Sequence, residues 1–153
     1  MRTFAVALAA TAALACHGSD AQRKPLPPDR AAELLHDRVW LDHAPRTPND
    51  RFQLVMFDAA GGAIRQHRTI WKGDFEAFFH EVDGGELEYF LPASGTSMRT
   101  AFHITPVDGP DHADHKLVIE HPPTGPREYY GWRLEHGSTD AWLAATFGRR
   151  AAR

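Results

Sequence analysis

Histidine is the residue type that most suggests chemistry in this chain, because ten of its 153 residues are histidines. The densest group is Asp111-His112-Ala113-Asp114-His115, which follows Gly109-Pro110. Imidazole and carboxylate groups at this spacing can bind Zn²⁺ or Cu²⁺. Asp111, His112 and His115 are therefore candidate metal ligands. The alternative, to which we give more weight, is a solvated polar loop, and we predict no cofactor.

Four further histidines fall in segments that we expect to be strands: His67, His80, His103 and His121. If two or three of them faced the interior of a barrel, they could ligate a cofactor or bind a polar head group. A single histidine in a strand is more often exposed or hydrogen-bonded at the surface. Because Phe102 and Ile104 have the pattern of a core-facing set, we expect His103 to point outward.

A catalytic signature is not evident in the sequence. The chain has four serines and no Gly-x-Ser-x-Gly motif, which argues against a serine hydrolase. Gly61-Gly62 and Gly84-Gly85 have the pattern of hairpin turns and do not form a phosphate-binding loop before a helix. We therefore predict that the protein is not an enzyme.

Cys16 is the single cysteine, so a disulfide framework within the chain and a zinc site with two or more thiolates are both excluded. Before it, Arg2 precedes an unbroken run of small and apolar residues that ends at Ala15. This run is shorter than the ~20 residues of a membrane-spanning helix and has the pattern of a secretory signal.

The segment Ala13-Leu14-Ala15-Cys16 resembles the bacterial lipobox, with Ala13 where that pattern prefers leucine. The resemblance implies that Cys16 is lipidated and anchors the protein in a membrane. The alternative is an ordinary signal that is cut near Ala15. That alternative would leave a free thiol in an oxidising compartment. His17 follows the cysteine where aspartate would imply inner-membrane retention, so we expect the periplasmic side of the outer membrane of the bacterial cell envelope.

The sequence divides into four parts on this interpretation. Residues 1–15 are the signal peptide, and residues 16–28 are a polar, proline-rich tether. Residues 29–148 are the folded domain, and residues 149–153 are a basic tail.

The charge balance argues against nucleic acid as a partner. The formal net charge is -3, and removal of residues 1–15 takes away Arg2 alone, which leaves 16 basic and 20 acidic residues. Phosphate backbones require a basic surplus, so we predict no nucleic-acid binding. We also expect a monomer.

The pattern of residues 29–148 predicts a mainly β domain with a short helix at each end. A proline and an acidic residue open the first helix at Pro28-Asp29, and a second helix is expected over 138–148. Eight strand-like runs lie between them. They are Val39–Asp42, Phe52–Asp58, Ala63–Trp71, Phe75–Val82, Glu86–Leu91, Met98–Thr105, Lys116–His121 and Glu128–Leu134. The short links predict an antiparallel eight-stranded meander that closes into a barrel and so leaves no exposed edge.

This arrangement resembles the lipocalin-like (calycin) barrels over roughly residues 30–148. Asp37-Arg38-Val39-Trp40 stands where lipocalins carry Gly-x-Trp, although the glycine is absent. The resemblance implies that Arg133, late in the barrel, packs over Trp40 at the closed end. Barrels of the fatty-acid-binding-protein and nitrobindin types fit the strand count nearly as well.

The aromatic residues of the domain could either line a ligand cavity or fill the core. The candidate pocket residues are Trp40, Phe52, Trp71, Phe79, Tyr89, Phe102 and Arg133. We expect an envelope-anchored lipoprotein whose barrel binds a small hydrophobic or amphipathic ligand. The alternative is a periplasmic interaction or inhibitor module with a filled barrel, which would contact its partner through the loop Pro92–Ser97.

Overall fold

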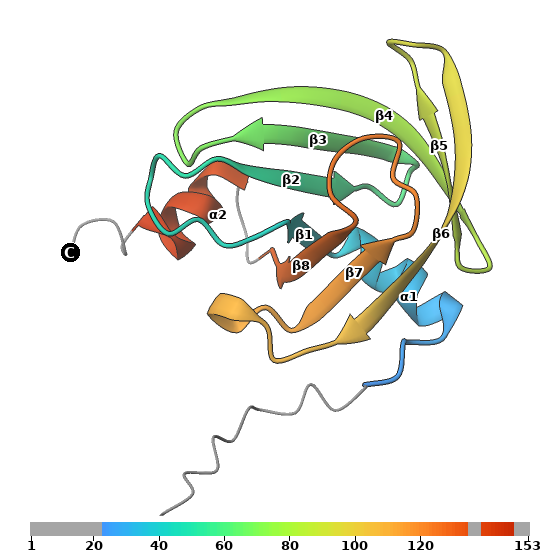
Figure 1. Cartoon of the computed structure of the whole chain (residues 1–153), viewed down its shortest axis with the longest axis horizontal. Coiled ribbons are helices and arrows are strands. Elements are labelled where there is room, and N and C mark those ends of the chain that lie inside the picture. The colour runs from blue at the N-terminus through green and yellow to red at the C-terminus, as the bar shows by residue number, and fades with distance from the viewer. Residues whose placement is uncertain (1–22, 135–138, 149–153) are drawn as a thin grey trace, which may run out of the picture.

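The chain folds into a closed antiparallel barrel of eight strands, which confirms the predicted fold class and is compatible with a calycin-like fold (Figure 1). The computed structural model describes residues 23–134 and 139–148. Each strand pairs with the next, and β8 closes the barrel by pairing with β1. The strands are β1 (Arg38–Leu41), β2 (Phe52–Phe57), β3 (Gly62–Arg68), β4 (Gly73–Asp83), β5 (Glu86–Leu91), β6 (Thr96–Pro106), β7 (His115–Ile119) and β8 (Glu128–Arg133).

One helix closes the barrel and another covers its outer wall. Helix α1 (Pro28–His36) has proline at its first position and Asp29 in its first turn, and it buries Ala31, Leu34 and Leu35 against one end of the barrel. Helix α2 (Thr139–Thr146) packs Trp142 and Leu143 against the outside of β1, β2 and β8. A single turn of 3₁₀ helix, η1 (Pro110–His112), lies between β6 and β7. None of the described helices is long and apolar enough to cross a membrane.

Strand β3 ends at Arg68, three residues before the predicted end at Trp71. The reason is a local turn around Thr69. The Thr69 hydroxyl oxygen accepts hydrogen bonds from the backbone N–H groups of Trp71 (3.3 Å) and Lys72 (3.2 Å). Threonine hydroxyls stabilise such turns in competition with strand pairing. The turn removes Trp71 from the sheet and returns the chain at Gly73.

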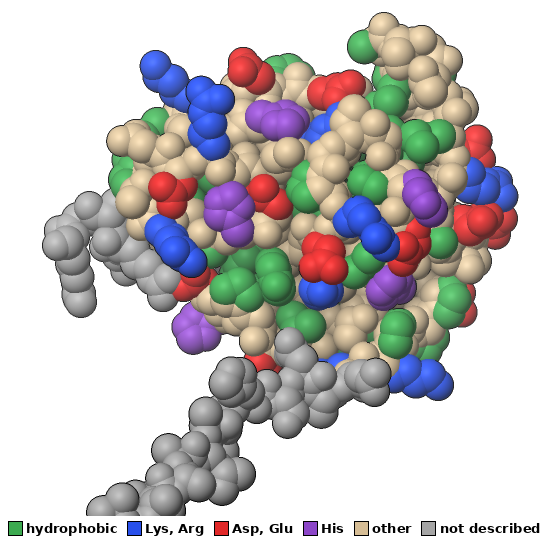
Figure 2. All heavy atoms as spheres, in the orientation of Figure 1, with side chains coloured by type: hydrophobic (Ala, Val, Ile, Leu, Met, Phe, Trp, Pro, Cys, Tyr) green, Lys and Arg blue, Asp and Glu red, His purple; other side chains and the backbone are tan. Residues whose placement is uncertain are grey.

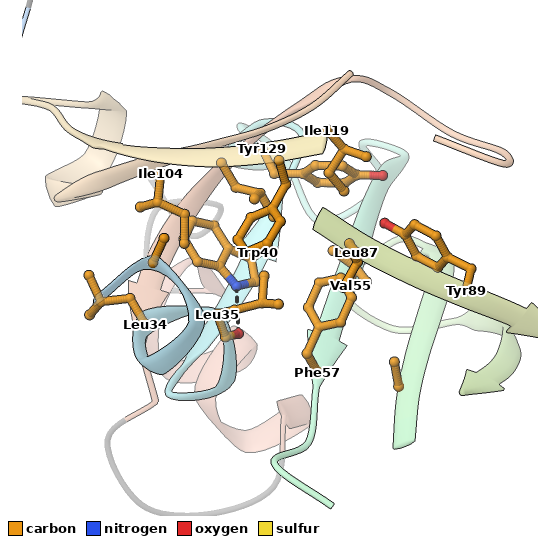
Figure 3. Close-up of a cluster of buried hydrophobic side chains, with 14 of the residues drawn as sticks. Leu34, Leu35, Trp40, Val55, Phe57, Leu87, Tyr89, Ile104, Ile119 and Tyr129 are labelled. Carbon is orange, nitrogen blue, oxygen red and sulfur yellow. Dashed lines mark hydrogen bonds between the residues drawn. The ribbon is translucent and has the colours of Figure 1, made fainter. Parts of the chain in front are cut away.

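Alternation along the strands builds two separate cores. The inner core fills the barrel and includes Trp40, Phe57, Phe78, Leu87 and Ile104 (Figure 3). The outer core lies between the wall and α2. It comprises Val39, Leu41, Ala44, Phe52, Leu54, Ile70, Ala113, Trp132, Trp142, Leu143 and Phe147. The barrel is therefore packed on both faces of β1, β2 and β8. Elsewhere, charged side chains of both signs are interspersed on the face drawn in Figure 2.

Candidate functional site

The two ends of the barrel differ, and one of them is sealed. At the sealed end, α1 packs across the lumen and the indole Nε1 of Trp40 donates a hydrogen bond to the carbonyl oxygen of Leu35 at 3.0 Å (Figure 3). The opposite end, which we call the mouth, is formed where β1, β3, β5 and β7 end and β2, β4, β6 and β8 begin. Its loops are 42–51, 69–72, 92–95 and 120–127.

A pocket of about 1080 Å³ opens at the mouth, between the β1–β2 loop and the β3–β4 turn. Its lining is mostly polar, and Trp71 contributes an indole that is 64% exposed. The lining residues are Asp42, Asn49, Arg51, Phe52, Gln53, Gln66, His67, Arg68, Thr69, Trp71, Lys72, Gly73, Asp74 and Asp140. A pocket of this size can accommodate a small organic molecule.

Gln53 connects this pocket with a buried polar group deeper in the barrel. Three inward-pointing side chains come from the adjacent strands β3, β4 and β5: Arg65, Glu76 and Tyr89. Tyr129 of β8 approaches Arg65 and Tyr89 across the lumen. We call these four residues and Gln53 the mouth cluster. Arg65 is 5% exposed and pairs with the Glu76 carboxylate. In Figure 3, the hydroxyl groups of Tyr89 and Tyr129 point toward the same part of the lumen.

Burial raises the pKa of both tyrosines in the mouth cluster. The pKa of Tyr129 is raised to about 12, chiefly because its hydroxyl is desolvated, while the nearby Arg65 charge partly opposes the shift. Desolvation also raises the pKa of Tyr89, with a further contribution from Tyr129. Both hydroxyls therefore keep their protons near neutral pH and act as hydrogen-bond donors.

Two buried polar atoms of the mouth cluster have no hydrogen-bond partner among the described residues. These atoms are the side-chain oxygen Oε1 of Gln53, an acceptor, and the Nε of Arg65, a donor. Burying an unpaired polar group costs roughly 1–3 kcal/mol. An ordered water, an ion or a polar group of a ligand would satisfy such atoms.

The β7–β8 loop lies over the mouth cluster. The carbonyl oxygen of Thr124 accepts a hydrogen bond from an Arg65 terminal nitrogen at 3.0 Å. Gly125 follows with φ +86, and a Cβ at this position would lie 2.7 Å from Gln53 Oε1 and 3.0 Å from the Tyr129 hydroxyl. Only glycine combines this backbone conformation with so close an approach. The loop thus lies directly on the polar groups of the cluster.

The predicted pocket residues are distributed over three different places. Trp40, Tyr89 and Phe102 belong to the inner core. Phe52 belongs to the outer core and also borders the mouth pocket, as does the exposed Trp71. Phe79 lies on the outer wall of β4 and is 58% exposed, outside the lumen.

The arginine expected over Trp40 is also placed differently. The Arg133 side chain is 68% exposed, and its nearest acidic partner is Asp37 at 3.9 Å. Arg38 is the buried arginine at this end, and it forms ion pairs with Asp114 (3.1 Å) and Asp37 (3.4 Å). Its side chain and the Trp40 ring both lie against Gly131. Arg38, two residues before Trp40, therefore lies buried at this end, where the resemblance implied Arg133.

The three candidate metal ligands lie in and after η1. Asp111 and His112 have positive φ angles, 51° and 66°, and the Asp111 carbonyl oxygen accepts a hydrogen bond from the Trp132 indole at 2.9 Å. His112 is exposed, whereas His115 contacts Asp114 through its Nδ1 at 2.8 Å. Within residues 23–134 and 139–148, no three or more histidine, cysteine or acidic side chains are grouped so that they could hold a metal ion. Asp111, His112 and His115, the candidate ligands, therefore do not form such a group within these residues.

The strand histidines fall on both faces. His103 alternates with the buried Phe102 and Ile104 and points outward, as expected. His67 lines the mouth pocket, and His121 lies just beyond β7 and is exposed. His80 is buried, and it contacts His36 of α1 with 3.1 Å between the two Nε2 atoms.

Sequence reasoning did not identify the mouth cluster, although its members carry a signal. Arg65 stands between Ala63 and His67 in the alternating run of β3, and Ala63 is paired with the buried aromatic Phe78. An arginine at an inward-facing position of a strand is expected to be buried and paired with an acidic group. The alternative is that the strand register has been assigned wrongly by one residue.

Comparisons of this chain with protein-family models, with curated proteins and with solved structures found no match. The lipidation candidate Cys16 lies outside the described residues.

Proposed function

We propose that this protein is a small-molecule-binding barrel that takes an amphipathic ligand at its mouth and is not an enzyme. The single observation that carries this proposal is the buried donor Arg65 Nε of the mouth cluster, which has no hydrogen-bond partner among the described residues. A ligand with a carboxylate or another carbonyl-bearing group would receive hydrogen bonds from Arg65 and the tyrosine hydroxyls. Its less polar part would contact Trp71 and Phe52 in the pocket.

The protonation states of the cluster favour binding over catalysis. A general acid or base works best when its pKa lies near the working pH. The burial that raises the pKa of Tyr129 to about 12 makes this side chain a permanent donor near neutral pH. Charge-assisted hydrogen bonds from a buried arginine are among the strongest available for recognition of a carboxylate.

The test is binding of a fluorescent long-chain carboxylic acid to the wild-type chain and to variants. We expect Arg65→Met to weaken binding by about tenfold or more, since a hydrogen bond to a charged group is worth ~1.5–3 kcal/mol. Arg65→Lys should recover part of this loss, because it keeps the charge. Tyr129→Phe should weaken binding by a smaller factor.

Tyr130→Phe is the matched control, because Tyr130 is the next residue on β8 and packs against the outer core instead. It should bind the probe as wild type does. Equal binding by wild type and Arg65→Met, or no binding by wild type, would contradict the proposal. Native mass spectrometry of protein purified without detergent would show whether a ligand is carried from the cell.

We propose further that the barrel is exported and is held at the bacterial envelope through a lipid on Cys16. This part of the proposal rests on the lipobox-like residues 13–16. Attachment by several acyl chains is effectively permanent, at ~0.8 kcal/mol per buried CH₂.

A second candidate function is an inhibitor that inserts a loop into an enzyme cleft. The observation in its favour is the tip of the β5–β6 hairpin, Pro92–Ser97, which is exposed throughout and projects beyond the other strands in Figure 1. The test is hydrolysis of peptidoglycan by lysozyme in the presence of the barrel. Inhibition that is lost on replacing Ser94-Gly95 with bulky residues would support this function, and no inhibition would contradict it.

A further inference from the structure

The outer wall of the barrel has three sectors with different coverings. Over β1, β2 and β8 the wall is apolar, and α2 covers it. Over β6 and β7 the wall carries polar and charged groups such as Arg99, His103 and Lys116. Over β3, β4 and β5 the wall carries a patch of exposed apolar side chains, and no described segment of the chain covers this patch.

This third sector forms one continuous surface, which we call the aromatic face: Ile64, Phe75, Ala77, Phe79 and Phe90. Ile64 pairs across the strands with Ala77, and Phe79 pairs with Phe90. The rings of Phe79 and Phe90 are stacked with centroids 6.3 Å apart. The exposed fractions of Ile64, Phe75, Phe79 and Phe90 are 41%, 72%, 58% and 42%. Four of the five most exposed large hydrophobic residues among those described therefore lie side by side.

We propose that the aromatic face binds a second copy of the chain and forms a two-fold symmetric dimer, in place of the monomer expected from the sequence. At 150–250 Å² per aromatic side chain, the face exposes roughly 400 Å² of apolar surface. The buried core of a homodimer interface is about 65% apolar. If the roughly 400 Å² of apolar surface is that share, each copy contributes roughly 600 Å² to the interface. The pair would bury about 1,200 Å², which exceeds the ~1,000 Å² expected of a specific interface.

The charges at the two ends of the face are complementary. At the sealed end, Glu81 lies directly opposite Glu88, and like charges in such a cross-strand pair repel. Arg99 pairs with Glu86 and Glu88, whereas Glu81 has no ion pair among the described residues. At the mouth end, Lys72 lies in the β3–β4 turn, where it borders the mouth pocket. It is exposed and has no ion pair within the described part of the chain.

A two-fold axis that lies in the interface, perpendicular to the strands, places the mouth end of one copy against the sealed end of the other. Each copy then places Lys72 over Glu81 of the other, so the symmetric contact is made twice. The same acidic end disfavours an anionic membrane as the occupant of this face, because anionic lipids attract basic surfaces and repel acidic ones.

The test is sedimentation velocity over a range of concentrations of the chain with Cys16→Ser, which lacks both the proposed lipid and the thiol and is the wild-type reference for the variants below. We expect its sedimentation coefficient to rise with concentration toward that of a dimer. Phe79→Glu, at the centre of the aromatic face, should raise the dimer dissociation constant by at least about tenfold. Thr105→Glu is the control, since it adds the same charge on the outer wall opposite Lys116.

A charge swap distinguishes the symmetric dimer from non-specific hydrophobic association. Lys72→Glu and Glu81→Lys should each weaken the dimer, and the double variant should recover it. A reference chain that stays monomeric up to about 100 µM would overturn the proposal. So would a dimer that Phe79→Glu leaves intact, as expected if another segment of the chain covers the face or makes the contact.

Discussion

His80 shows how a buried titratable residue couples the fold to pH. Burial is the main cause that lowers the pKa of His80 to about 4, and the charge of the adjacent His36 contributes to the same shift. The same desolvation lowers the pKa of His36, although the nearby Asp58 carboxylate opposes this. The neutral pair can share one hydrogen bond across the 3.1 Å between its Nε2 atoms, and the His80 ring also packs on Phe57.

We expect stability to fall as the pH is lowered from 6.5 to 4. The unfolded chain binds a proton at His80 near pH 6.5, whereas the folded chain resists it until about pH 4, so the stabilisation is complete above pH 6.5. Urea unfolding at pH 7.5 and pH 4.5 should show a loss of about 2 kcal/mol from this residue. His80→Phe should reduce this pH dependence, whereas His121→Gln, at an exposed site, should leave it unchanged.

Gly131 is required by the ring of Trp40 at the seam between β1 and β8. A Cβ at Gly131 would lie 2.7 Å from Trp40 Cζ3 and 3.1 Å from the Arg38 side chain. Gly131→Ala should therefore cost about 1–3 kcal/mol of stability through overpacking. Gly62→Ala is the control, because a Cβ there meets nothing within 4 Å. A thermal melt in which both variants match wild type would show that the seam adapts.

At the scale of elements, α2 forms the second core and does not contribute to the barrel lumen. Leu143 is fully buried among Val39, Leu41 and Trp132, and the Trp142 and Phe147 rings meet edge to face at 5.6 Å. Arg68 of β3 forms an ion pair with Asp140 in the first turn at 2.5 Å. The helix is thus held to the wall by both apolar and charged contacts.

We predict that Leu143→Ala destabilises the protein by about 2–5 kcal/mol, the range for a buried leucine truncated to alanine. Thr146→Ala, at an exposed position of the same helix, should change stability by less than about 0.5 kcal/mol. The measurement is urea unfolding followed by tryptophan fluorescence, since Trp132 and Trp142 both lie in this core. A small effect of Leu143→Ala would mean that α2 is not part of the cooperative unit.

The whole molecule combines a sealed end, a polar mouth and an uncovered aromatic face. Helix α1 seals the lumen and the β7–β8 loop covers the mouth cluster. Strands β3, β4 and β5 contribute to both sites with opposite faces, because Arg65, Glu76 and Tyr89 point inward while the aromatic face points outward. A ligand at the mouth and a second copy on the wall could therefore be bound at the same time.

At the scale of the whole molecule, we expect the protein to be attached to a membrane through Cys16. In a bacterium that processes lipoproteins, the wild-type chain should enter the detergent phase of a Triton X-114 partition and incorporate labelled palmitate. Cys16→Ser should remain in the aqueous phase and carry no label. The same behaviour for both proteins would contradict lipidation at Cys16.

The amino-acid pattern by itself determined the strand number, the helix at each end and the inward phase of several strands. Alternation places Phe102 and Ile104 inside and His103 outside without reference to any other strand, because the side-chain period of a strand is two. The Gly84-Gly85 turn was predictable for a similar reason, since both glycines adopt positive φ, 56° and 95°.

The tertiary structure alone decided which aromatic residues are buried. In β4, Phe78 and Phe79 are adjacent, so either could face the lumen, and a shift of register by one residue exchanges them. Pairing with Ala63 turns Phe78 inward and leaves Phe79 on the aromatic face. The same registers bring Arg65, Tyr89 and Tyr129 together from β3, β5 and β8, and proximity across a closed barrel is not encoded in any local pattern.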